Sequence, residues 1–141
     1  MTGRIIGLDP GERRIGVALS DPLGIIATPL TVLDRRSSNV LDALRTLIAE
    51  HEVTTVVVGL PVGLDGVEGA AAAHARAFGR EIQEEFEIDV TYCDERFTSV
   101  LAESALLEGD VSRRGRRDAR DKVAAAIMLQ GYLDVRREDQ P

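Results

Sequence analysis

Hydrophobic positions change their period along this chain, and the first third of the chain follows a strand-like pattern. Residues 4–8 form a short apolar run that ends at Asp9, and residues 14–19 form a second one. Each run is followed by a turn signal rich in Pro, Gly and Asp. Residues 25–33 form a third run, in which Pro29 predicts an edge strand or a bulge. Because the connections are short, these strands should form an antiparallel meander.

A helical period follows. Residues 37–39 are Ser, Ser and Asn, which are favourable N-caps, and apolar residues then recur at helical spacing from Val40 to Ile48. The β-branched run 53–58 predicts a strand that is covered on both faces. Apolar residues predict a further helix over residues 69–86 and a further strand over residues 88–93.

The last third of the chain is less regular. Thr98 or Ser99 could cap a short helix that runs to Leu107. Residues 110–117 are polar, arginine-rich and aperiodic, and we expect a loop there. A final helix is expected over residues 118–135, with an alanine run that allows close approach to a sheet.

The order of these elements, β-β-β-α-β-α-β-α-α, predicts an α/β fold. The meander and the two later parallel strands should form one mixed five-stranded sheet with helices on both faces. A length of 141 residues suits one domain, which we expect over residues 1–136, with a frayed tail at 137–141.

Charge and composition reduce the number of function classes that fit this chain. The net charge is −7, which argues against a general nucleic-acid binder, but five arginines gather between residues 113 and 120. The one cysteine, Cys93, cannot form an internal disulfide and is expected to be a core thiol. The sequence shows neither a signal peptide nor a run of 18 apolar residues, so we expect a soluble cytoplasmic protein without a membrane partner.

Acidic residues mark three elements that could converge. Asp9 ends the first strand, Asp94 and Glu95 end the last one, and Asp121 lies near the start of the last helix. Ligand sites in open α/β sheets lie at the carboxyl ends of strands. Converging carboxylates favour Mg²⁺ or Mn²⁺, and two such ions can promote phosphodiester hydrolysis.

The assignment of the ligands leaves alternatives open. Asp94 and Glu95 should point to opposite faces, so at most one is a direct ligand, and the longer Glu95 is favoured. Asp118 could assist in an outer shell. Two of these acids could instead have a purely structural role. Asp9 could be a turn residue, and Asp121 could be a first-turn acid favoured by the helix dipole. The arginine cluster could be a solvated loop. With only two histidines, a histidine-based metal site is not favoured.

Several blocks of sequence resemble the YqgF (RuvX-like) family of RNase H-like proteins. They are Leu8-Asp9-Pro10-Gly11, Arg14–Ala18 with Ser20-Asp21, Gly59-Leu60-Pro61 with Asp65-Gly66, Asp94–Thr98, and Asp121 ahead of Ala124-Ala125 and Leu129–Leu133. They span nearly the whole chain in order. Departures are Ser99, where the family often has threonine, and Arg120 and Lys122, which flank Asp121 in place of small apolar residues.

The resemblance implies an RNase H-like nuclease whose metal ligands and catalytic residues are Asp9, Glu95 (or Asp94) and Asp121, with Mg²⁺ or Mn²⁺ as cofactor. Its implied role is trimming the 5′ end of pre-16S rRNA, on a precursor of the small ribosomal subunit. Substrate phosphates would be held by arginines of the sequence motifs and of the basic segment: Arg14, Arg96, Arg113, Arg114, Arg116 and Arg117.

Two alternatives remain at this point. The chain could resolve four-way DNA junctions as a dimer, or it could be a non-catalytic RNA- or ribosome-binding module. The sequence is compatible with a monomer or a weak homodimer. An actin-like kinase is disfavoured because such proteins need two domains of this type, and 141 residues hold one.

Overall fold

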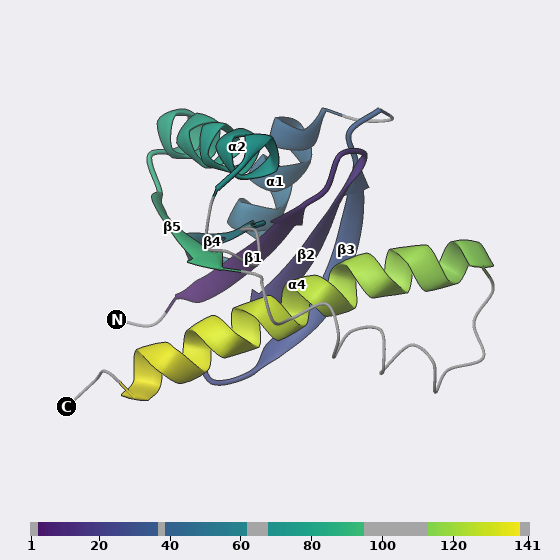
Figure 1. Cartoon of the computed structure of the whole chain (residues 1–141). Helices are drawn as coiled ribbons and strands as arrows, with labels where there is room; N and C mark the ends of the chain where they lie inside the picture. The colour runs from purple at the N-terminus through teal and green to yellow at the C-terminus, as the bar shows by residue number, and fades with distance from the viewer. Residues whose placement is uncertain (1–2, 37–38, 62–67, 95–112, 139–141) are drawn as a thin grey trace.

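The computed structural model describes residues 3–36, 39–61, 68–94 and 113–138. In these residues, five strands form one sheet, and three helices cover it (Figure 1). The strands are β1 (Arg4–Pro10), β2 (Arg14–Ser20), β3 (Ala27–Asp34), β4 (Val53–Leu60) and β5 (Asp89–Asp94). The helices are α1 (Val40–Glu50), α2 (Ala70–Phe86) and α4 (Arg113–Glu138).

The sheet has the order β3-β2-β1-β4-β5. The first three strands pair antiparallel, whereas β4 is parallel to both β1 and β5. This confirms the predicted mixed sheet and its meander. Pro29 lies in the edge strand β3, next to a register shift opposite Val17 and Ala18, as expected for a residue that cannot donate a backbone hydrogen bond.

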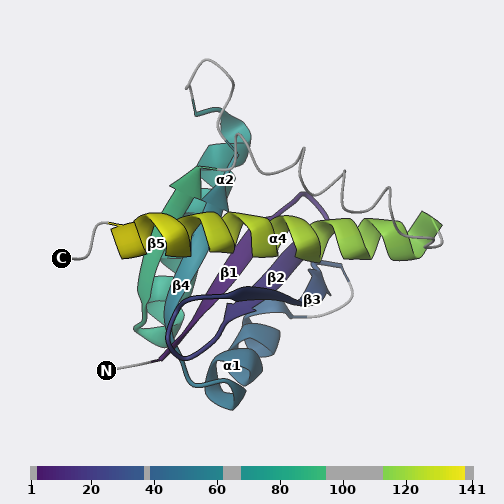
Figure 2. The same cartoon turned by 90° about the horizontal axis from the view of Figure 1, so that it is seen from below.

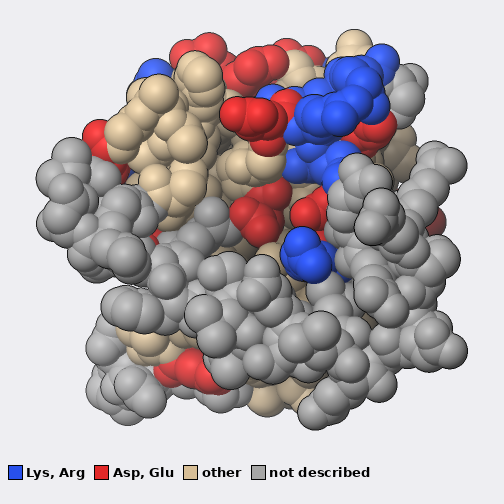
Figure 3. Space-filling view, turned by 45° about the vertical axis from the view of Figure 1, so that its right-hand side comes forward, with Lys and Arg blue, Asp and Glu red and all other residues tan. Residues whose placement is uncertain are grey.

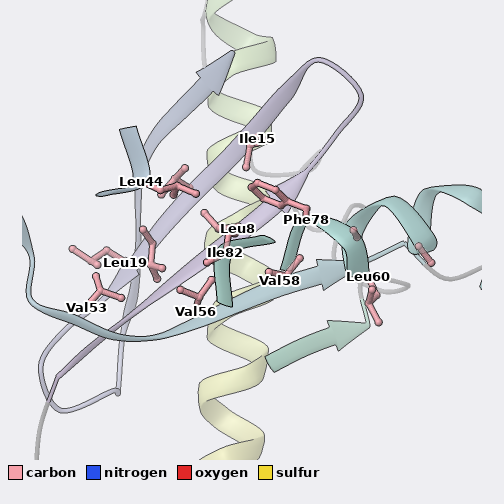
Figure 4. Close-up of a cluster of buried hydrophobic side chains, with 14 residues drawn as sticks. Leu8, Ile15, Leu19, Leu44, Val53, Val56, Val58, Leu60, Phe78 and Ile82 are labelled. Atoms are coloured by element: carbon pink, nitrogen blue, oxygen red, sulfur yellow. The ribbon is translucent and has the colours of Figure 1, made fainter. Parts of the chain in front are cut away.

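One face of the sheet packs against α1 and α2. Large aliphatic side chains from β1, β2 and β4 point to this side, with Leu44 of α1 and Phe78 and Ile82 of α2 packed against them (Figure 4). Asn39 caps α1 by accepting hydrogen bonds from the backbone N–H groups of Leu41 and Asp42. This cap and the apolar stripe explain why the helix forms where the sequence predicts it.

Among the described residues, α4 is the helix that covers the other face, and it crosses the strands obliquely (Figure 2). Its contact residues include Ala125, Met128, Leu129 and Leu133, all fully buried. The sheet residues beneath are small at several points. A Cβ at Gly7, for example, would lie 3.0 Å from the Cβ of Leu129. Small residues therefore let the helix approach the sheet closely.

The last helix differs from the sequence-based expectation. It begins at Arg113, so residues 113–117 are helical and not a loop, and it extends to Glu138, two residues beyond the predicted domain end. Arginine is a good helix former, and the apolar period that revealed the later turns is absent from this segment. The short helix expected at 98–107 lies outside the described residues. In the described part of the chain, no helix is long and apolar enough to cross a membrane.

Candidate active site at the carboxyl edge of the sheet

Asp9 lies at the carboxyl end of β1, on the face covered by α4. Ile6 and Leu8 belong to the core beneath α1 and α2, whereas Ile5 belongs to the core beneath α4. Since successive strand residues alternate between faces, Asp9 shares the side of Ile5 and Gly7. Its side chain is half-buried.

Gly16 brings α4 directly beside Asp9. The two residues are opposite each other in the β1–β2 pair, so both face α4. A Cβ at Gly16 would overlap the carbonyl oxygen of Asp121 and lie 2.6 Å from its carbonyl carbon. Side chains of opposed strand residues start about 5 Å apart. The backbone of Asp121 therefore sits next to Asp9, across the space that a side chain at position 16 would fill.

Arg14 holds the carboxylate of Asp121. Arg14 lies two residues before Gly16 and thus on the same face of β2. Its Nε donates to Oδ2 of Asp121 at 3.1 Å, and both side chains are only about one-third exposed or less, at 27% and 33%. The ion pair fixes the Asp121 side chain toward the sheet.

Asp121 is not a first-turn acid. Because α4 begins at Arg113, Asp121 lies eight residues, more than two turns, into the helix. The helix dipole acts mainly within the first turn, so it does not explain this carboxylate. Its position follows instead from the contact with Gly16 and the pair with Arg14.

Asp94 lies on the wrong face to join these two carboxylates. It pairs in register with Leu60, which belongs to the core under α1 and α2. It also lies two residues after Tyr92, on the same face of β5, and Tyr92 packs against that core. Cys93 is partly buried and packs instead against the core under α4. Glu95 lies outside the described residues.

The structure describes some of the remaining predicted site residues and not others. Asp118 lies on α4, three residues before Asp121. Arg96 lies outside the described residues. The predicted phosphate-binding arginines of the basic segment all lie in the first turns of α4: Arg113, Arg114, Arg116 and Arg117.

Asp9 and Asp121 fit the ligand chemistry of Mg²⁺ or Mn²⁺. Both supply carboxylate oxygens, which these ions prefer. Asp121 already attracts a cationic group, the guanidinium of Arg14. Within the described residues, no group of three acidic, histidine or cysteine side chains is close enough to hold a metal ion. Magnesium commonly uses only one or two carboxylates and completes its shell with water and substrate phosphates.

The sequence analysis did not predict the close contact between Gly16 and the backbone of Asp121, although the sequence holds a signal for it. Gly16 lies between the buried residues Ile15 and Val17 of β2. An isolated glycine in a strand often marks close approach of another backbone. The glycine alone does not say which backbone approaches it.

The same end of the molecule carries a cleft on the opposite face of the sheet. A cleft of about 530 Å³ is lined by residues that follow β1, β3 and β4 and by the first turns of α2: Pro10, Gly11, Glu12, Arg35, Pro61, Ala71, His74 and Ala75. Figure 3 shows part of this end, where Lys and Arg side chains gather beside Asp and Glu side chains. The exposed basic residues here include Arg13, Arg35 and Arg36.

Comparisons with known proteins agree with one another over most of the chain. A family model described as "RuvX: Holliday junction resolvase" matches residues 3–135. A protein of Moorella thermoacetica named "Putative pre-16S rRNA nuclease" is 50% identical over 132 residues, covering 93% of this chain and 94% of its own. A protein of Myxococcus xanthus with the same name is 47% identical, covering 95% and 89%.

Solved structures show the same fold at low sequence identity. Thermus thermophilus RuvC in complex with a Holliday junction substrate has a TM-score of 0.56 and 15% identity, with 96% of both chains covered. A second structure of Thermus thermophilus RuvC gives a TM-score of 0.55 and 14% identity. The fold is therefore RNase H-like, and the match of the family model over residues 3–135 shows that the chain belongs to the RuvX family.

Proposed function

We propose that this protein is a divalent-metal-dependent nuclease that hydrolyses phosphodiester bonds and processes the 5′ end of pre-16S rRNA. One observation carries the proposal: Gly16 allows α4 to bring Asp121 beside Asp9 on one face of the sheet's carboxyl edge. Two neighbouring carboxylates attract cations, and the ion pair of Asp121 with Arg14 already shows this attraction. The relatives at 43–50% identity, named for action on pre-16S rRNA, support the choice of substrate.

Asp9 and Asp121 would hold the metal. Asp9 lies one residue before the end of β1, which is the central strand of the sheet, so its carboxylate would be a main ligand of the ion. When bound, Mg²⁺ or Mn²⁺ would supply an activated water and stabilise charge on the leaving oxygen. The protein's part is to fix the carboxylate oxygens and to orient the scissile phosphate.

Glu95 is our choice for the third ligand. Asp94 faces the core under α1 and α2, opposite to Asp9 and Asp121. This favours Glu95 over Asp94, in agreement with the greater reach of the glutamate. Asp118 remains a candidate for an outer-shell role, three residues before Asp121 on α4.

Arg14 would serve two states of the site. In the structure it neutralises Asp121. If Asp121 held a metal, the guanidinium of Arg14 would lie beside it and could bind a substrate phosphate through two parallel hydrogen bonds. The arginines at the start of α4 and Arg96 would bind further phosphates, which position the substrate without reading its sequence.

The direct test is cleavage of a precursor rRNA that carries the 5′ extension, with Mg²⁺, with Mn²⁺ and with a chelator. Wild type should cut only with metal, and Asp9→Asn and Asp121→Asn should cut at least about a hundredfold more slowly, since loss of even an outer-shell partner costs up to that much. Asp94→Asn, as the matched control on the other face, should retain most activity. Equal cleavage by wild type and Asp9→Asn would refute the proposal.

Resolution of four-way DNA junctions is a second candidate, because the matching family model is described as a Holliday junction resolvase. Symmetric cutting of two strands needs two active sites, and hence a dimer. A junction substrate run beside the precursor rRNA separates the two functions. Light scattering with and without junction DNA gives a second readout, since a strict monomer under both conditions contradicts the resolvase alternative.

A further inference from the structure

Three arginines of the described chain lie over aromatic rings, and one of them differs from the other two. Arg45 lies over Phe86, Arg76 over Tyr92 and Arg35 over Phe78, with guanidinium-to-ring distances of 5.6, 5.1 and 5.3 Å. Such stacking holds a guanidinium in place. The three differ in what else their side chains bind.

Arg45 and Arg76 have carboxylate partners. Arg45 pairs with Asp42 and Glu85 at 2.6 Å each, and Arg76 pairs with Glu68 at 2.7 Å. These carboxylates raise the pKa of Arg45 and Arg76 above the ordinary value, with the side-chain hydrogen bonds as the main cause. Their charges are balanced within the protein, and their contacts tie neighbouring elements together.

Arg35 has no such partner among the described residues. Its backbone N–H donates to Arg13, and its Nε donates to the carbonyl oxygen of Gly11 at 3.0 Å. The guanidinium is therefore fixed from one side by Phe78 and from another by the β1–β2 turn. Its two Nη groups make no hydrogen bond or ion pair with the described part of the chain. An exposed, fixed and uncompensated guanidinium is suited to a phosphate.

Arg35 lines the 530 Å³ cleft at the same end of the sheet as the candidate active site. The volume falls in the range of small-molecule sites, about 300–1,000 Å³. The walls combine small apolar residues with one imidazole: Pro10, Pro61, Ala71, Ala75 and His74. Apolar walls and an imidazole can accept the flat face of a nucleobase. Glu12 is the acidic residue among the described lining residues, and it would disfavour an anion.

The cleft and the candidate active site meet at β1. Asp9 faces α4, and the next residue, Pro10, lines the cleft on the side of α2. A strand that passes over the end of β1 would therefore reach both. The β1–β2 turn joins them physically, since Arg35 binds Gly11 and Arg14 binds Asp121.

We propose that this cleft is a nucleotide-binding subsite, in which Arg35 binds a phosphate and the walls with His74 receive a base. The proposal rests on the nuclease function above and specifies where the substrate strand continues beyond the scissile phosphate. The subsite lies on the face of the sheet opposite to Asp9 and Asp121.

The test measures binding of a fluorescent single-stranded RNA oligonucleotide in chelator, so that cleavage plays no part. Arg35→Met should weaken binding about tenfold, the worth of one charge-assisted contact. It should also lower the slope of log affinity against log salt by about 0.7, the value for one phosphate contact on a single strand. Loss of the turn contact alone would not change the salt slope.

Matched variants make the result specific. Arg45→Met removes an arginine that also lies over an aromatic ring, and it should leave affinity and salt slope unchanged. Glu12→Gln should tighten binding two- to threefold, because it removes the cleft's negative charge. His74→Ala should weaken binding several-fold through lost stacking. Thermal unfolding of each variant checks that it folds.

Competition with a nucleoside monophosphate distinguishes a free nucleotide from a strand. If the monophosphate competes at concentrations similar to those at which the oligonucleotide binds, the cleft takes a free nucleotide. If the monophosphate competes only at much higher concentrations, the cleft takes a nucleotide of a strand. Unchanged affinity and salt slope in Arg35→Met, or no effect of Glu12→Gln, would overturn the subsite. Cleavage that depends on Asp9 but not on Arg35 would leave the nuclease function standing, whereas Arg35-dependent binding without cleavage would leave only the subsite.

Discussion

The two faces of the sheet are built in different ways, and the difference explains where the candidate active site lies. Under α1 and α2, large side chains such as Leu8, Ile15 and Val58 fill the space, and two helices cover it. Under α4, glycine replaces such side chains at positions 7 and 16, and one helix approaches the backbone itself. A face of large residues separates a helix from the sheet, whereas a face of small ones lets charged groups on the two elements meet.

Gly16→Ala, on the face under α4, should have the largest effect on stability and on cleavage. The new Cβ would overlap backbone atoms of Asp121, which cannot swing away as a side chain can. We expect a loss of about 3 kcal/mol in the free energy of unfolding, the upper range for overpacking, and displacement of Asp121 with loss of cleavage. Urea unfolding and the rRNA assay measure both. Gly131→Ala is the control, because open space surrounds Gly131 on α4, and it should stabilise by about 0.5–1 kcal/mol.

A smaller effect is expected for the corresponding change on the other face, Gly79→Ala in α2. Its Cβ would overlap the hydroxyl of Tyr92 and lie 2.8 Å from a ring carbon. This obstacle is a side chain, held by a hydrogen bond to the carbonyl of Arg76 and by the stacked Arg76. It can move, so we expect a loss of about 1–2 kcal/mol. Cleavage by the folded fraction should match wild type. A greater loss than for Gly16→Ala would reverse the contrast between the faces.

Arg14→Met should separate metal binding from substrate binding. The substitution removes one positively charged partner of Asp121 and takes a positive charge away from the proposed metal position. We expect Mn²⁺ to bind severalfold more tightly, because a nearby like charge disfavours a cation. RNA should bind more weakly through loss of one phosphate contact. Titrations with metal alone and with RNA in chelator measure the two effects. Weaker metal binding would show that Arg14 orients the ligands and does not compete with the metal.

The smallest expected effect lies at the other end of the sheet, in the β2–β3 connection. Hydrogen bonds from the backbone N–H groups of Ile26 and Ile25 hold the pKa of Asp21 below its ordinary value of 3.8. A lowered pKa in the folded state stabilises the protein above pH 3.8, and this stabilisation is lost as the pH falls through the folded-state value. Asp21→Asn should therefore unfold slightly earlier than wild type at pH 7, with a difference that shrinks toward pH 3. A constant difference would contradict this origin.

Much of the fold could be predicted from sequence because its signals are local. The period-two and β-branched runs located five strands, and Asn39 marked the start of α1. The start of α4 could not be predicted, since residues 113–117 lack an apolar stripe and only their intrinsic helix propensity supports the helix.

The candidate site was predictable in its residues but not in its contacts. Strand-end position indicated Asp9, and both its place near the start of the last helix and the resemblance to the family indicated Asp121. The pairing of Arg14 with Asp121 and the fixed guanidinium of Arg35 depend on elements far apart in sequence. The faces of β5 required the register with β4, which places Asp94 with Leu60 on the side away from α4.

The central claim is that Asp9 and Asp121 form one metal site on the α4 face. Titration of Mn²⁺ into the intact protein, followed by calorimetry or by the Mn²⁺ resonance signal, tests it most directly. We predict that Asp9→Asn and Asp121→Asn each weaken binding at least about tenfold, and that the double variant is little worse than either, as expected for two ligands of one site. Asp94→Asn should bind as wild type does. Wild-type affinity in Asp121→Asn, or an equal loss in Asp94→Asn, would contradict the account.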